Sequence, residues 1–98
     1  MDDDALLRTA ADRLEALAAR TTPGDWRIGG LLASRPEVIA HRDGGTEHVA
    51  EARAGTAAWI SSLSPAVAAP LAAWLRTAAA TDADAVGVAR VLVERLPG

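Results

Sequence analysis

The most regular hydrophobic pattern in the chain runs through its first twenty residues. Leucine and alanine recur there at three- and four-residue spacing and form one apolar stripe. The acidic residues Asp2, Asp3 and Asp4 stand where the positive end of a helix dipole favours negative charge. Pro23 then disfavours helix in the residue before it, and Gly24 lets the chain reverse direction. The sequence therefore predicts an N-terminal helix that ends in a turn.

Alternation of polar and apolar residues replaces the helical spacing after this turn. Asp25–Ile28 alternates, and Glu37–Arg42 and Glu47–Ala52 read as two further strands joined by the glycine-rich turn Asp43–Thr46. Leu31–Ala33 fits either a separate short strand or an irregular lead-in. The middle of the chain thus predicts a small antiparallel sheet of two or three strands.

Helical spacing returns after the strands and continues to the end of the chain. A short segment carries Trp59, and a second opens with Ser64-Pro65, a capping residue followed by proline in the first turn. A last segment follows Thr81 and Asp84, which resemble a capping box. The order predicts one α+β domain over residues 1–98, with a helix, a sheet, and then two or three C-terminal helices.

The apolar content of the chain comes mostly from small side chains. Half of the residues are hydrophobic, but only 3% are aromatic, and all of these are tryptophan. We therefore expect the tryptophans to supply a large share of the packing, with Trp26 holding the first strand against the first helix. The spacing does not divide the larger apolar residues between a core and an interface. These candidates are Trp26, Trp59, Val67, Leu71, Trp74, Leu75, Val88, Leu92 and Leu96.

Charge and composition restrict the classes of partner. The formal net charge of −3 argues against a duplex nucleic-acid surface, which normally needs a basic face. The absence of cysteine excludes disulfides and thiolate chemistry. The first residues are acidic where a signal peptide would be basic, and no uninterrupted run of about 18 apolar residues marks a membrane span. We expect a cytoplasmic protein without a membrane partner.

Two pairs of residues are candidates for chemistry. In the predicted hairpin register His41 faces His48, and two histidines on one sheet face can ligate a transition metal. Arg27 and Arg42 add positive charge to the sheet, where a small anion or nucleotide could bind and stack on Trp26. The ordinary alternatives are solvent-exposed hairpin histidines and cross-strand ion pairs.

Reaction chemistry has little other support in the sequence. The chain lacks cysteine, tyrosine and lysine, and its serines cluster beside a helix start, where capping explains them. Neither glycine pair, Gly29-Gly30 nor Gly44-Gly45, matches a phosphate-binding loop. We expect no catalytic residues, no metal and no cofactor, so the protein is not expected to be an enzyme.

Two sequence elements resemble the small Ead-like early proteins of phages and prophages, whose short relatives are common in actinobacteria. The first is Pro23-Gly24 with Trp26, after an N-terminal helix. The second is Ile60 with Ser64-Pro65-Ala66-Val67, followed by Leu71 and Leu75. The resemblance spans residues 5–76 and implies a phage or prophage setting, without catalytic residues to transfer.

These patterns together predict an interaction protein. The apolar helix surface exceeds what three strands can cover, so we expect a small homo-oligomer, dimeric or larger, that also contacts an unidentified host or phage protein. One alternative is an anion- or nucleotide-binding protein that uses the sheet arginines. A second alternative is a metal-dependent enzyme that uses His41 and His48.

Overall fold

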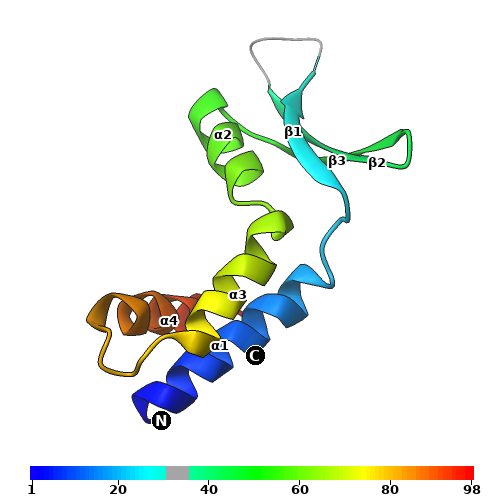
Figure 1. Ribbon diagram of the computed structural model, residues 1–98. Helices are drawn as coiled ribbons and strands as arrows, with labels where there is room; N and C mark the ends of the chain where they lie inside the picture. The colour runs from blue at the N-terminus through cyan, green and yellow to red at the C-terminus, as the bar shows by residue number, and fades with distance from the viewer. Residues whose placement is uncertain (31–35) are drawn as a thin grey trace. The chain divides into compact units, whose positions relative to one another are not determined.

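The computed structural model describes residues 1–30 and 36–98 (Figure 1). The elements in chain order are α1 (Asp3–Ala18), β1 (Asp25–Gly29), β2 (Glu37–Arg42), β3 (Gly45–Glu51), α2 (Ala54–Ser62), the 3₁₀ turn η1 (Pro65–Val67), α3 (Ala68–Thr77) and α4 (Ala83–Arg95). The strands form one antiparallel sheet in the order β1-β2-β3. The predicted α+β class is confirmed, with one helix before the sheet and helices after it. The candidate strand Leu31–Ala33 lies outside the described residues.

The chain divides into two compact units that are interleaved along the sequence. Unit 1 combines Met1–Thr21 with Val67–Gly98, and unit 2 is the intervening Thr22–Ala66. Unit 1 therefore contains α1, α3 and α4, whereas unit 2 contains the sheet and α2.

Unit 1 is built around α1, which contacts both α3 and α4 (Figure 1). Leu6 and Leu7 of α1 are buried together with Leu75 of α3 and Val86 of α4. The other buried members of this core are all alanine: Ala10, Ala11, Ala72, Ala85 and Ala89. Because alanine projects only one methyl group, the predicted apolar stripe of α1 brings the helix backbones close together.

The expectation that tryptophan supplies much of the packing is wrong. Trp59 is 69% exposed and Trp74 is 41% exposed, and Trp26 is only half-buried. In unit 1 the alanine-lined contacts explain the exposure of Trp74, since helices that approach through methyl groups leave no space between them for an indole. Side-chain size was therefore a poor guide to burial in this chain.

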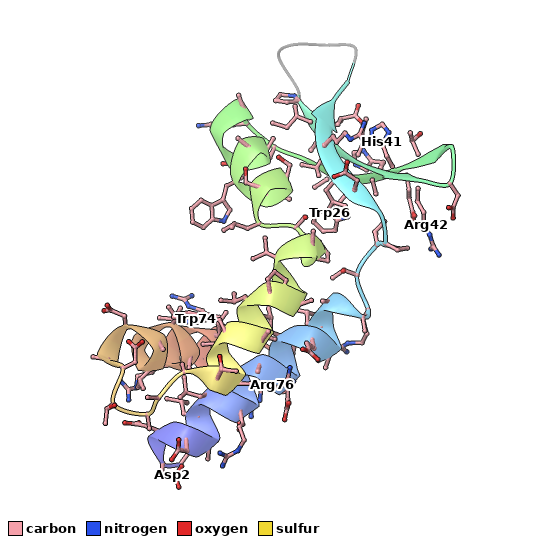
Figure 2. All side chains as sticks on the ribbon, in the orientation of Figure 1. Asp2, Trp26, His41, Arg42, Trp74 and Arg76 are labelled. Atoms are coloured by element: carbon pink, nitrogen blue, oxygen red, sulfur yellow. The ribbon has the colours of Figure 1, made fainter. Side chains whose placement is uncertain are left out.

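Aspartates cap the N-termini of two unit 1 helices. The carboxylate of Asp2 accepts a hydrogen bond from the backbone N–H of Ala5 at 2.7 Å, at the start of α1 (Figure 2). The carboxylate of Asp82 accepts from the N–H groups of Asp84 and Ala85, both at 3.1 Å, at the start of α4. The predicted capping residue, Thr81, is therefore one position too early, and Asp82 satisfies the helix N–H groups instead.

The hairpin of unit 2 has a shorter turn than the sequence suggested. Only Asp43 and Gly44 form the turn, both with positive φ (51° and 78°), as a type I′ turn requires. Gly45 already pairs with Arg42, so His41 faces Thr46. The predicted pairing of His41 with His48 is wrong. It assumed the four-residue turn Asp43–Thr46, whereas the two-residue turn shifts the register of β3 by two residues.

Glycine is required in the turn that leads from Thr22 into β1. Gly24 has φ of +114°, a region that side chains with a Cβ rarely adopt. A Cβ at this position would also stand 2.8 Å from the carbonyl oxygen of His41. Pro23 and Gly24 therefore do more than stop a helix, because they let the chain pass closely over the end of β2.

Unit 2 has its own small apolar interior. Val38 and Ala40 of β2 are buried, and Ala57 of α2 is fully buried. The helix α2 contacts β1 and β2. A single helix and a short sheet bury few side chains, so much apolar surface of unit 2 stays exposed.

Candidate functional site

The two arginines proposed to bind an anion lie on opposite faces of the sheet. Arg27 pairs with Ile39, and side chains alternate along a strand, so Arg42 points to the other face of β2. Each guanidinium also has a carboxylate beside it: Arg27 Nε lies 2.7 Å from Asp25, and Arg42 Nε lies 3.3 Å from Asp43. The structure therefore does not bring these arginines together into one site.

The indole of Trp26 is engaged within its own unit. Its ring N–H donates a hydrogen bond to the carbonyl oxygen of Thr22 at 3.0 Å (Figure 2). The side chain is half-buried, so it is not a free stacking platform. A ligand stacked on Trp26 has no support in this geometry.

The two histidines share a sheet face but stand diagonally. His41 faces Thr46, and His48, two residues further along β3, faces Ile39. His48 is occupied by Glu37, with 3.0 Å between its Nδ1 and the carboxylate oxygen. Among residues 1–30 and 36–98 no group of three or more metal-ligating side chains occurs. The pair therefore lacks the third ligand that a metal centre would need.

A shallow depression of about 210 Å³ lies beside Arg42 in unit 2. Its lining mixes that arginine with Glu47 and small residues, so its charge is balanced. The lining residues are Pro23, Ala40, Arg42, Gly45, Thr46 and Glu47. Such a surface offers no clear preference for an anion or a cation.

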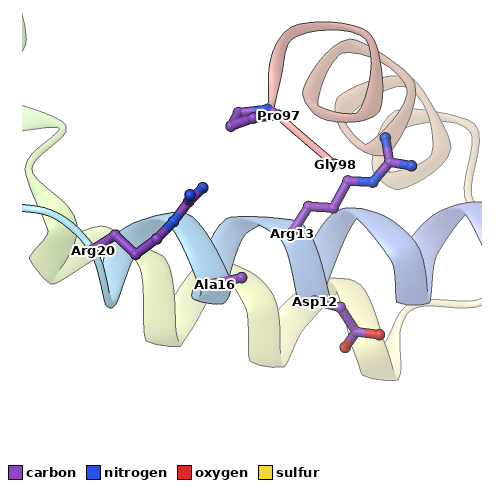
Figure 3. A pocket seen from close by; sticks show the side chains of 6 residues that line it. All are labelled: Asp12, Arg13, Ala16, Arg20, Pro97 and Gly98. Atoms are coloured by element: carbon purple, nitrogen blue, oxygen red, sulfur yellow. The ribbon is translucent and has the colours of Figure 1, made fainter.

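A larger depression in unit 1, of about 570 Å³, was not anticipated from the sequence (Figure 3). Its lining consists of Asp12, Arg13 and Ala16 of α1, Arg20 in the turn after α1, and Pro97 and Gly98 at the chain end. The 3- and 4-residue spacing of Arg13, Ala16 and Arg20 in the sequence was the available signal. Arg13 also donates to the carbonyl oxygen of Val93 at 3.3 Å, which gives it a structural role.

Arg76 ties α3 to α1. Its guanidinium donates to the carboxylates of Glu15 and Asp12, with 2.8 Å between Nη2 and the Asp12 oxygen (Figure 2). These hydrogen bonds, that to Glu15 first, raise the pKa of Arg76 above its ordinary value. Because arginine is charged at every accessible pH already, the shift describes a structural contact and creates no acid or base.

The apolar candidates separate clearly once their exposure is known. Leu75 is fully buried, and Leu71, Val88 and Leu92 pack against the unit 1 core. Val67 and Leu96 are half-buried. Among residues 1–30 and 36–98, the exposed large apolar side chains other than Met1 are Ile28, Trp59 and Leu63 in unit 2, and Trp74 and Val91 in unit 1. Of these, Ile28, Leu63 and Val91 were missed as surface candidates. A hydrophobic pattern shows which side of an element is apolar, but it does not show whether another element packs against that side.

One stretch is long and apolar enough to cross a membrane by length and composition alone. It runs over Ala54–Thr77, and 22% of its most apolar window is buried. Core helices of soluble proteins meet the same criterion, and here a turn at Leu63–Ser64 and η1 separate α2 from α3. The expectation of no membrane partner remains a prediction.

Comparison of the chain with protein-family models, curated proteins and solved structures gives no match. The resemblance to Ead-like phage proteins therefore remains a prediction.

Proposed function

We propose that this protein is a non-catalytic interaction module that works as a homo-oligomer and presents apolar helix surface to a second protein. The carrying observation is the pair Trp59 and Leu63. Trp59 lies in α2, Leu63 is the C-cap residue four positions later, and their side chains are 69% and 53% exposed. Tryptophan is among the residues most enriched in binding hot spots, where its large apolar surface becomes buried.

The charged groups favour the same proposal. Among the described residues, no polar or charged side chain is buried. The raised pKa of Arg76 reflects the tie between α1 and α3, which is a structural contact. A phage or prophage setting is supported only by the sequence resemblance.

Self-association is tested by sedimentation velocity from about 5 to 500 µM, a range that covers micromolar dissociation constants. We expect the mass to rise above the 10.1 kDa of one chain as the concentration increases. A protein that stays monomeric across the whole range refutes the oligomeric part of the proposal.

The partner surface is tested by affinity capture from host lysate with Trp59→Ala, using Thr56→Ala as the control. Thr56 is exposed on the same helix, so this control alters α2 without removing the indole. We expect a specific captured protein to be retained by the wild type and the control and lost with Trp59→Ala. Equal capture by all three chains would show that Trp59 is not the contact.

A further inference from the structure

The outward side of α4 forms an open groove of about 500 Å³ with no covering element in unit 1. The groove is lined mainly by small or apolar residues with one carboxylate: Ala83, Asp84, Gly87, Val88, Val91 and Leu92. Val91, one of these lining residues, is 57% exposed, while Ala85, Val86 and Ala89 face the core from the opposite side of the helix. We propose that a second copy of this chain docks here, with its own α4 packed antiparallel against the first.

Charge along the groove sets this orientation. Asp84, Val88, Val91 and Arg95 follow one another at spacings of four, three and four residues, so they lie on one side of α4. Asp84 and Arg95 are exposed and form no ion pair within residues 1–30 and 36–98. In an antiparallel pair Asp84 of each copy stands opposite Arg95 of the other, about 16 Å apart along each helix. A parallel pair would place like charges together.

The apolar centre obeys the same symmetry. When Asp84 stands opposite Arg95 of the second copy, Val88 stands opposite Val91 of that copy. The contact is therefore isologous: one surface meets itself across a two-fold axis, the commonest arrangement in soluble homo-oligomers.

Gly87 gives an independent reason for close approach from outside. Glycine is the least favourable residue in a helix interior after proline, yet Gly87 sits in the middle of α4. A Cβ there would meet nothing within 4 Å in the chain itself, so internal packing does not require glycine. Its missing side chain instead leaves room for another helix backbone to come near, as small residues do at tight helix contacts.

The size of the contact predicts its strength. Thirteen residues of helix are about 20 Å long, which gives a contact below the roughly 800 Å² per partner of a standard interface. We therefore expect a weak dimer, with a dissociation constant in the micromolar range.

Charge exchange tests the geometry by sedimentation equilibrium over the same concentration range. Asp84→Arg or Arg95→Asp alone places like charges together twice per dimer, and each should raise the dissociation constant at least about tenfold. The double exchange Asp84→Arg with Arg95→Asp should return it to within about threefold of the wild type. Arg8→Asp, the same change at an exposed position of α1, is the matched control and should leave association unchanged.

Two substitutions at Gly87 supply a second test, because one is expected to change the stability of the chain and the other its association. Gly87→Ala should raise the thermal midpoint, because alanine favours helix and its methyl group meets nothing in the chain. Gly87→Leu should fill the groove and raise the dissociation constant about tenfold or more. Circular dichroism of each variant shows that α4 is folded, so loss of association cannot be attributed to unfolding.

This inference rests on the proposed self-association, and the outcomes separate the two. A strictly monomeric wild type overturns both. An oligomeric wild type whose association is unaffected by the charge exchanges and by Gly87→Leu overturns the α4 contact and leaves self-association standing. Loss in both single exchanges without recovery in the double exchange overturns the antiparallel pairing.

Discussion

Two valines of the same helix provide a direct test of where the unit 1 core lies. Val86 is 7% exposed and packs in the core, whereas Val91 is 57% exposed on the outward side of α4. Replacing either by alanine removes the same two methyl groups and gives the same gain in helix propensity. Any difference between the two variants therefore reports burial.

The expected magnitudes follow from that burial. Two buried methyl groups at about 0.8 kcal/mol each, together with a cavity term, exceed a propensity gain of about 0.5 kcal/mol, so Val86→Ala should cost about 2 kcal/mol. Because Val91 is mostly exposed, Val91→Ala loses less than half of the free energy of burying the two methyl groups and leaves no cavity. The free energy of unfolding should therefore fall by only about 0.2 kcal/mol. For a domain of about 100 residues, each kcal/mol of lost stability lowers the thermal midpoint by roughly 5 °C. We therefore expect the thermal midpoint to fall by about 10 °C in Val86→Ala and by about 1 °C in Val91→Ala.

Thermal and urea unfolding followed by circular dichroism measures both variants. The measurement is repeated over a range of protein concentrations, because a contribution of self-association makes the midpoint depend on concentration and the loss of core packing does not. Equal midpoint losses for the two variants would refute the assignment of Val86 to the core and of Val91 to the surface.

Three further predictions concern single contacts. Gly24→Ala should destabilise by about 2 kcal/mol because of its positive φ and the nearby His41 carbonyl, whereas Gly55→Ala, in open space near the start of α2, should be neutral or slightly stabilising in urea unfolding. Arg76→Gln should lower the thermal midpoint at low salt, and the loss should shrink towards 1 M NaCl, where the Debye length is about 3 Å; Arg90→Gln, whose contact with Asp3 is 3.8 Å, should change little. Asp82→Ala should cost about 1 kcal/mol through loss of the α4 cap, with an unchanged midpoint counting against that role.

The element order was predictable because each segment carries a local signal. The period of the apolar residues, Pro23-Gly24, the glycine turn and Ser64-Pro65 act over a few residues, and the structure has helices and strands where they indicate. The hairpin register was not predictable in the same way. Whether Gly45 belongs to the turn or to β3 depends on a single pair of backbone angles, and both loop lengths fit the same sequence.

Burial depends on contacts between distant segments, for which a sequence pattern carries no direct signal. Trp59 and Leu75 both lie on apolar stripes, but only Leu75 packs against other helices, in the core of unit 1. The candidate anion site failed for a related reason, since Arg27 and Arg42 are close in the sheet but belong to opposite faces. The groove on α4 was equally hidden, because the sequence presents Gly87 only as a weak point of a helix.

The interleaving of the two units has a consequence for synthesis on the ribosome. The leucines of α1 emerge first, but their partners Leu75 and Val86 follow only after all of Thr22–Ala66 has been translated. At a translation rate of about 5–20 residues per second, the apolar side of α1 stays exposed to solvent for several seconds. The sheet and α2 can form during this time. The nascent protein is therefore expected to need shielding by a chaperone around α1 more than around the sheet and α2.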